Sequence, residues 1–265
     1  IRRDFPELAA RAEEMQGLLL EQSGRYALAE VAARRRIGQH RLARYLAQRM
    51  AQEELSGDTL REAQIVLDEY AAADEQLAQA RMLLSSLQSE LPGDEAAIAA
   101  PLRAFIEREL TYDSLPRLQP FLQNADAANL PAGEKLAFAY SGWVLGAAHA
   151  GSSLKEAVAL WDARALVLEY LHPQTDFGDR KLLLERLQES EGVSVEVIAR
   201  MVPQLPTPLE FASGPAATMQ TIELPPTLDS DITVRYAVQA PPEYDPARPY
   251  PAIVLLRPEG RTIED

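Results

Sequence analysis

The sequence predicts a mainly α-helical fold, in which a long antiparallel helical bundle or hairpin precedes an irregular helical array and a C-terminal three-strand β segment. Residues 5–92 are rich in Ala, Leu, Glu, Gln and Arg, which lose little side-chain freedom in a helix. Prolines punctuate residues 94–210 and mark helix ends there, and apolar and polar residues alternate after Pro208. We therefore expect three parts, at residues 1–92, 93–210 and 211–265.

The composition is typical of a protein with a packed core, and its charge argues against nucleic acid as a partner. The chain has 265 residues, 47% of them hydrophobic, and a net charge of -14 with a pI near 4.8. Such an acidic chain lacks the basic surface that binds nucleic acid. It has no Cys, which leaves the compartment undetermined, and no apolar run near the length of a membrane span. Its start at Ile1 rather than Met suggests a clipped N-terminus.

A regular apolar seam marks the longest predicted helix. Thr59 and Glu62 form a capping box that predicts the helix start, and Pro92 breaks the helix after Leu91. Apolar residues recur three and four apart along it, as in a coiled coil or helical hairpin. The seam comprises Ala63, Val66, Tyr70, Ala73, Leu77, Ala80, Leu84, Leu87 and Leu91.

Two shorter stripes offer partners for this seam. The first comprises Leu8, Ala12, Met15, Leu19 and Tyr26, and the second Leu42, Leu46 and Met50. The simplest arrangement is an antiparallel three-helix bundle within the chain. Self-association through the same seam is the alternative.

The second helical part contains two glycines four residues apart, Gly142 and Gly146. Each costs about 1 kcal/mol relative to Ala inside a helix, so a neighbouring helix is expected to approach closely. The next helix opens with a second capping box, Ser153 and Glu156, and these two helices are predicted to pair. Its predicted apolar face comprises Leu154, Val158, Trp161, Ala165 and Leu168. No fixed-period repeat signature is present.

Three strands are predicted near the C-terminus. Residues 218–224 and 232–238 alternate apolar and polar side chains and are enriched in β-branched residues. Residues 252–256 are apolar on both faces, which is typical of an interior strand covered by helices. Because only nine residues follow, we expect the rest of that sheet to lie outside this sequence.

The order of motifs across residues 232–260 is specific. A strand ending in Pro precedes Tyr244-Asp245-Pro246, a Tyr250-Pro251 pair and an apolar run from Ile253 to Leu256. This order resembles the opening of α/β-hydrolases of the esterase and prolyl-oligopeptidase-like type. In those families the apolar strand runs into a His-Gly-rich turn that contributes to the oxyanion hole.

The resemblance implies a function and one candidate site. The sequence would be the N-terminal portion of a serine hydrolase that acts on an ester or peptide substrate without metal or organic cofactor. Arg257, Pro258, Glu259 and Gly260 stand where the oxyanion-side loop is expected. Pro258 departs from the family pattern, because it has no backbone N–H to offer an oxyanion. The resemblance does not reach the Gly-x-Ser-x-Gly elbow, the acid or the His, so no catalytic residue is assigned and the chain alone is predicted to be inactive.

The role of the helical region under this hypothesis is accessory: gating, substrate selection or assembly. The competing interpretation is a non-enzymatic helical module that binds a protein partner. Other motifs are weak: Ser152 and Lys155 match Ser-x-x-Lys without its companion motifs and are better read as a helix cap. The three histidines lack metal-ligand spacing, and the basic cluster at residues 34–44 is expected to pair with carboxylates across a helix interface.

Overall fold

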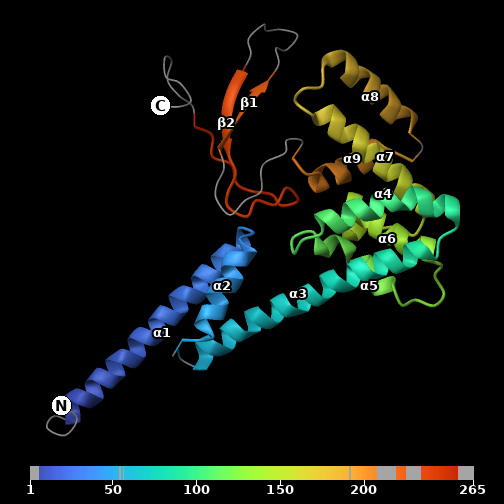
Figure 1. The fold of residues 1–265 in the computed structure, drawn as a ribbon. Helices are drawn as coiled ribbons and strands as arrows, with labels where there is room; N and C mark the ends of the chain where they lie inside the picture. Colours follow the sequence, from blue (N-terminus) through green and yellow to red (C-terminus); the bar gives the residue numbers. More distant parts are fainter. Residues whose placement is uncertain are drawn as a thin grey trace. The chain divides into compact units, whose positions relative to one another are not determined.

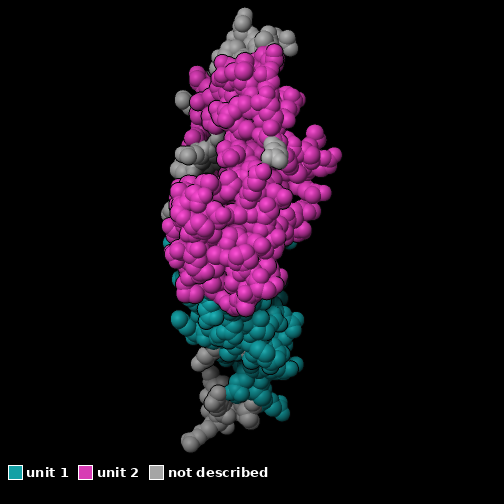
Figure 2. All heavy atoms as spheres, turned by 90° about the vertical axis from the view of Figure 1, so that its right-hand side faces the viewer, with its two compact units in different colours: residues 1–75 teal, residues 76–265 magenta. Residues whose placement is uncertain are grey.

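The computed structural model describes residues 6–53, 55, 57–190, 192–207, 219–224 and 234–255. The chain divides into two compact units, Ile1–Glu75 and Gln76–Asp265, which Figure 2 shows in different colours. Because compactness alone does not define an independently folding domain, the predicted division at residues 92 and 210 stays a prediction. As predicted, the described residues are mainly helical (Figure 1).

The first unit is a packing of three helical segments. They are α1 (Pro6–Arg36), α2 (His40–Met50) and the N-terminal part of α3 (Gly57–Ser89). Gly38, with a φ of 80°, lies in the tight turn between α1 and α2. The His40 ring meets the Tyr70 ring edge to face, with a Nδ1 to hydroxyl distance of 3.1 Å. The buried hydrophobic side chains of this unit are Val31, Ala43, Ala47, Met50, Ala63 and Tyr70.

The seam of α3 is buried as predicted, although the helix starts earlier than expected. The seam residues are buried or half-buried along the length of the helix. Those up to residue 75 belong to the first unit and the later ones to the second. Self-association is therefore not required to cover the seam. The helix begins at Gly57, which places Thr59 in the first turn rather than at the cap. Thr59 is buried against α1, where a Cβ on Gly24 would lie 2.7 Å from its Cγ2. Thr59 is therefore a buried residue of the first turn and not the boundary of the helix.

The upstream stripe was predicted to be a core face, and this prediction is wrong for the N-terminal half of α1. Leu8, Met15, Leu19 and Tyr26 are each 60% or more exposed, and Ala12 is exposed as well. The buried contacts of α1 begin further along, at Gly24 and Val31. Helical period alone does not decide whether a partner helix is long enough to cover a stripe.

The second unit is built mainly from short helices. After α3 follow α4 (Gly93–Glu109), α5 (Gln119–Asn124), α6 (Ala132–Leu145), α7 (Leu154–Leu171), α8 (Phe177–Glu189) and α9 (Val195–Met201). Three 3-10 helices connect them: η1 (Leu115–Leu118), η2 (Ala147–His149) and η3 (Val202–Gln204). Prolines lie at several of these starts, as expected from their fixed φ.

Helices α6 and α7 pack against each other and form the core of this unit. The indole Nε1 of Trp161 on α7 donates to the carbonyl oxygen of Tyr140 on α6 (3.1 Å). Ser153 caps α7, as predicted, by accepting from the backbone N–H of Glu156. The two glycines four residues apart have different roles. Gly142 allows a close approach, since a Cβ there would lie 2.6 Å from the carbonyl oxygen of Arg117, whereas Gly146 ends the helix with a φ of 85°.

Gly142→Ala is expected to destabilise the second unit, although Ala is the better helix former. The added methyl group would overlap a backbone carbonyl that cannot move without shifting η1, so we expect a loss of about 1–3 kcal/mol in the free energy of unfolding. Urea unfolding followed by tryptophan fluorescence measures it. Gly93→Ala is the matched control, because nothing lies within 4 Å of its Cβ position, and a change beyond about 0.5 kcal/mol there would undermine the comparison.

The β segment is a two-stranded antiparallel sheet. Strand β1 (Met219–Leu224) pairs with β2 (Val234–Gln239), with Ile222 opposite Tyr236, and Glu223 forms an ion pair with Arg235 across the strands. These strands agree with two of the three predicted ones.

The predicted third strand is not found. Residues 252–255 form no strand, and among the described residues none offers them a backbone hydrogen bond. Ile253, Val254 and Leu255 are 89%, 78% and 84% exposed. An apolar run becomes a strand only when a neighbouring strand satisfies its backbone groups, so the three-strand segment is not confirmed.

The hydropathy of the helices shows whether any of them could span a membrane. No helix in the described part of the chain has both the length and the apolar character needed to do so.

Candidate functional site

A cavity of about 970 Å³ lies within the second unit. It is bordered by α4, η1, α6 and α7 and by residues 204–207 and 244–247. Its volume falls in the range of small-molecule sites. We call it the arginine pocket, because Arg108, Arg117 and Arg164 line it and the latter two are buried.

Arg117, in η1, is a buried cation held by backbone carbonyls. Its guanidinium donates to the carbonyl oxygens of Gln204 (2.9 Å), Ala247 (3.2 Å) and, at a longer 3.5 Å, Trp143. Burial lowers the pKa of Arg117, and the nearby Asp245 carboxylate opposes this effect. Arg117 thereby joins η1 to the end of α6, to η3 and to the segment after β2.

Arg164, on α7, is equally buried but is surrounded by aromatic rings instead of acceptors. The side chain is 6% exposed, and its guanidinium carbon lies 4.9 Å from the Phe105 ring centroid and 5.2 Å from that of Trp161. These two rings meet edge to face. Burial, followed by the positive charge of Arg117, lowers the pKa of Arg164 to about 10, while Glu109 acts to raise it.

No described residue accepts a hydrogen bond from Arg164 or forms an ion pair with it. Its guanidinium nitrogens are also not among the fully enclosed polar atoms that lack a partner. They therefore border the open volume of the arginine pocket, which Arg164 lines. A buried guanidinium is costly unless its donors are satisfied, so this arrangement is unusual for a purely structural side chain.

The carboxylates nearest the two buried arginines are already engaged. Glu109 forms an ion pair with its neighbour Arg108 (2.7 Å). Asp245 accepts from the Thr111 hydroxyl (2.6 Å) and from the backbone N–H of Ala247 (2.8 Å). The hydrogen-bonding capacity of Arg164 is thus left for something that enters the pocket.

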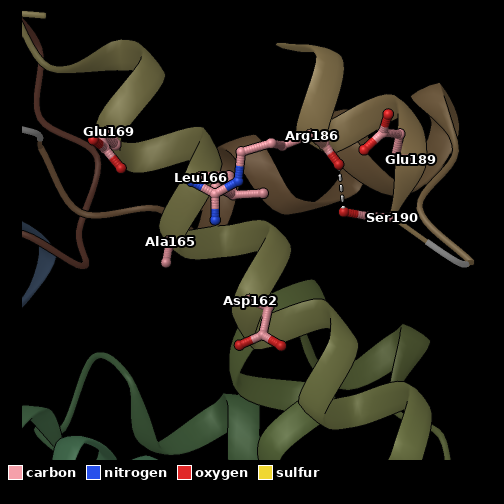
Figure 3. A pocket seen from close by; sticks show the side chains of 7 residues that line it. All are labelled: Asp162, Ala165, Leu166, Glu169, Arg186, Glu189 and Ser190. Atoms are coloured by element: carbon pink, nitrogen blue, oxygen red, sulfur yellow. Dashed lines mark hydrogen bonds between the residues drawn. The ribbon is translucent and has the colours of Figure 1, made fainter. Parts of the chain in front are cut away.

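A second pocket, of about 460 Å³, lies between α7 and α8 (Figure 3). Arg186 extends from α8 toward α7, while the carboxylates of Asp162, Glu169 and Glu189 point in different directions (Figure 3). Within the described ranges no group of three or more His, Asp or Glu side chains is placed to hold a metal ion. This pocket has the character of a solvated groove, and we favour the arginine pocket as the functional site.

The residues that the sequence nominated for the oxyanion-side loop, Arg257, Pro258, Glu259 and Gly260, lie outside the described residues. Their assignment stays a prediction. The Ser-x-x-Lys match at Ser152 and Lys155 precedes and opens α7, where Ser153 is the N-cap. The helix-cap interpretation of that motif is therefore confirmed.

The histidines are not brought together. His40 contacts Tyr70 in the first unit, and His172 accepts at Nδ1 from the backbone N–H of Gln174. Asp176, four residues after His172, caps α8 by accepting from the backbone N–H of Asp179.

Two members of the basic cluster at residues 34–44 pair with carboxylates across helix interfaces, as expected, whereas Arg34 pairs with Glu30 on its own helix. Arg35 on α1 forms an ion pair with Glu69 on α3 (2.7 Å), and Arg44 on α2 forms one with Asp74 (2.8 Å). These exposed pairs contribute little stability individually.

Sequence reasoning missed both buried arginines. The signal for Arg164 was present, because it follows Trp161 by three residues and precedes Leu168 by four, which puts a charged residue on the apolar face of its helix. Arg117 gave no such signal, since η1 is too short to show a periodicity.

Comparison with known proteins supplies no family. No family model, no curated protein and no solved structure matches the chain.

Proposed function

We propose that this chain is the N-terminal portion of a serine hydrolase of the esterase or peptidase type, with the helical region as its accessory domain. The proposal rests on the motif order of residues 232–260, which cover about 30 of the 265 residues. An accessory role is supported by contacts that fix residues 245–248, part of the segment that carries the resemblance, to the helical part of the second unit.

Three side-chain contacts fix this segment. Arg248 forms an ion pair with Asp113, and both side chains are less than 20% exposed. The other two are the hydrogen bond from the Thr111 hydroxyl to Asp245 and that from Arg117 to the carbonyl oxygen of Ala247. All three join the connection after α4 or η1 to residues 245–248.

The segment is also ordered internally. Asp245 closes a turn by accepting from the backbone N–H of Ala247, and its own N–H donates to the Tyr250 hydroxyl (3.0 Å). The rings of Tyr244 and Tyr250 lie 5.3 Å apart. Residues 244–247 of this segment line the arginine pocket. The exposure of Ile253 to Leu255 agrees with strands still to be paired there, since full burial of each would contribute about 1.5–3 kcal/mol.

A double-mutant cycle tests the anchoring. Asp113→Ala, Arg248→Ala and the double variant are expected to give a coupling of about 1–2 kcal/mol, because the pair is half-buried. The exposed pair Glu21–Arg25 is the matched control and is expected to give about 0.5 kcal/mol or less. Equal couplings in the two cycles would mean that the segment is not specifically held.

The proposal itself is tested on the full-length gene product. Its reading frame past Asp265 is expected to encode Gly-x-Ser-x-Gly within about 100 residues, followed by Asp and then His. A fluorophosphonate probe is expected to label that serine, and not its Ser→Ala variant. An early stop, or no labelling, would contradict the proposal.

The alternative, a non-enzymatic helical interaction module, is favoured by one observation. The N-terminal half of α1 exposes Leu8, Met15, Leu18 and Leu19, an apolar stripe without cover among the described residues. Sedimentation velocity of the intact chain, with Leu18→Gln/Leu19→Gln as comparison, measures whether this stripe mediates association. A monomer unaffected by the substitutions would contradict self-association through α1.

A further inference from the structure

We propose that the arginine pocket binds a carboxylate attached to an apolar body, with the Arg164 guanidinium as its principal ligand. This inference does not depend on the proposed hydrolase activity, because it concerns only residues of the second unit.

The anion is inferred from Arg164. This side chain is only 6% exposed and borders the cavity. Among the described residues it has no hydrogen-bond acceptor. Its guanidinium carbon lies over the Phe105 and Trp161 rings, at 4.9 Å and 5.2 Å from their centroids, and the neighbouring Glu109 is paired with Arg108. A cation–π contact does not use up the N–H donors of a guanidinium as an anionic acceptor would, so these donors can still bind an anion.

The class of anion follows from the remaining charges of the pocket. A guanidinium edge matches a carboxylate or a phosphate equally well in shape. However, two further carboxylates lie at the exposed rim of the pocket, Glu169 and Asp179. With Arg117 committed to three carbonyls, one unpaired cation faces these acids, so a singly charged carboxylate suits the site better than a doubly charged phosphate.

The apolar body is inferred from the rest of the lining. Phe105, Trp143, Leu168 and Pro206 contribute apolar surface beside the cation. The volume of about 970 Å³ exceeds the need of a bare anion. Apolar walls with one charged group that fixes orientation are the usual build of a small-molecule site.

Tryptophan fluorescence provides the measurement. The only two tryptophans, Trp143 and Trp161, each lie beside a buried arginine, with ring-to-guanidinium distances of 5.5 Å and 5.2 Å. Titration with cyclohexanecarboxylate at constant ionic strength is expected to change the emission saturably. The neutral isostere cyclohexanecarboxamide and inorganic phosphate are each expected to bind about tenfold more weakly or worse. Equal responses to the acid and its amide would overturn the proposal.

A second arm distinguishes two sources of the carboxylate. Acetyl-Ala-Leu, with a free C-terminus, is compared with its C-terminal amide. Tighter binding of the peptide acid than of cyclohexanecarboxylate would identify a peptide C-terminus, and the reverse order a free organic acid. Both orders support the carboxylate site, whereas failure of both acids refutes it. None of these readouts requires catalysis, so they are independent of fluorophosphonate labelling.

Substitution of Arg164 separates a ligand-binding role from a structural one. Arg164→Met is expected to weaken carboxylate binding about tenfold or more, without lowering the melting temperature of the ligand-free protein, because it removes a buried charge that has no hydrogen-bond acceptor or ion-pair partner among the described residues. Arg164→Lys keeps the charge without the fork and is expected to bind with intermediate affinity. Arg186→Gln, in the other pocket, is the control and is expected to bind normally. A lower melting temperature in Arg164→Met, or undiminished binding, would refute the assignment.

Discussion

Replacement of Tyr140 by Ala is expected to cost the second unit about 3–5 kcal/mol, the largest effect of any single substitution considered for this chain. Tyr140 lies on α6, is fully buried, and is among the largest completely enclosed side chains. Its removal leaves a cavity between α4, α6 and α7 that the surrounding helices fill only in part. Urea unfolding followed by the emission of Trp143 and Trp161 measures the loss, because both tryptophans lie in this unit.

Two comparisons identify the cause of that loss. Tyr140→Phe keeps the ring and removes a hydroxyl whose only recorded acceptor, the carbonyl oxygen of Ala99, is 3.4 Å away, so a cost of about 1 kcal/mol or less is expected. Tyr170→Ala, on the partly exposed side of α7, controls for loss of a tyrosine as such and is expected to cost less than about 1 kcal/mol. If Tyr140→Phe were as damaging as Tyr140→Ala, polar contacts and not packing would hold α6.

The sequence was most informative where apolar periodicity extends over many turns. The α3 seam is buried over its length, and the Ser153 cap and the first two strands occur as predicted. The same reasoning failed for the stripe of α1, because a period says which face is apolar but not whether another helix reaches it. It also failed at Thr59, where a capping pattern coincides with a residue buried by packing.

The predicted third strand and the candidate site show a different limit. Whether Ile253 to Leu255 form a strand depends on pairing partners, which local sequence does not specify. The arginine pocket was missed because its residues come from helices and loops distant in the sequence. A charged residue within an apolar helical stripe, as at Arg164, is the local sign of a buried charge.

The two buried arginines of the pocket are expected to respond differently to the same substitution. Arg117→Met should lower the free energy of unfolding by about 2–4 kcal/mol, because three backbone carbonyls lose a charged donor and have no alternative partner of comparable strength. Arg164→Met removes no hydrogen bond recorded among the described residues and should not lower it. Because methionine replaces arginine in both variants, the difference in their free energies of unfolding isolates the contribution of the carbonyl acceptors.

The location of the damage gives an independent readout of this difference. Arg117 donates to the carbonyl oxygen of Ala247, and the neighbouring Arg248 N–H donates to that of Asp245 within the same turn. Arg117→Met is therefore expected to accelerate amide hydrogen exchange across residues 245–250, while Arg164→Met leaves their protection unchanged. Equal acceleration in the two variants would mean that both guanidiniums hold the segment after β2. Arg164 would then be a structural cation, and the pocket would lose the unpaired charge from which its ligand is inferred.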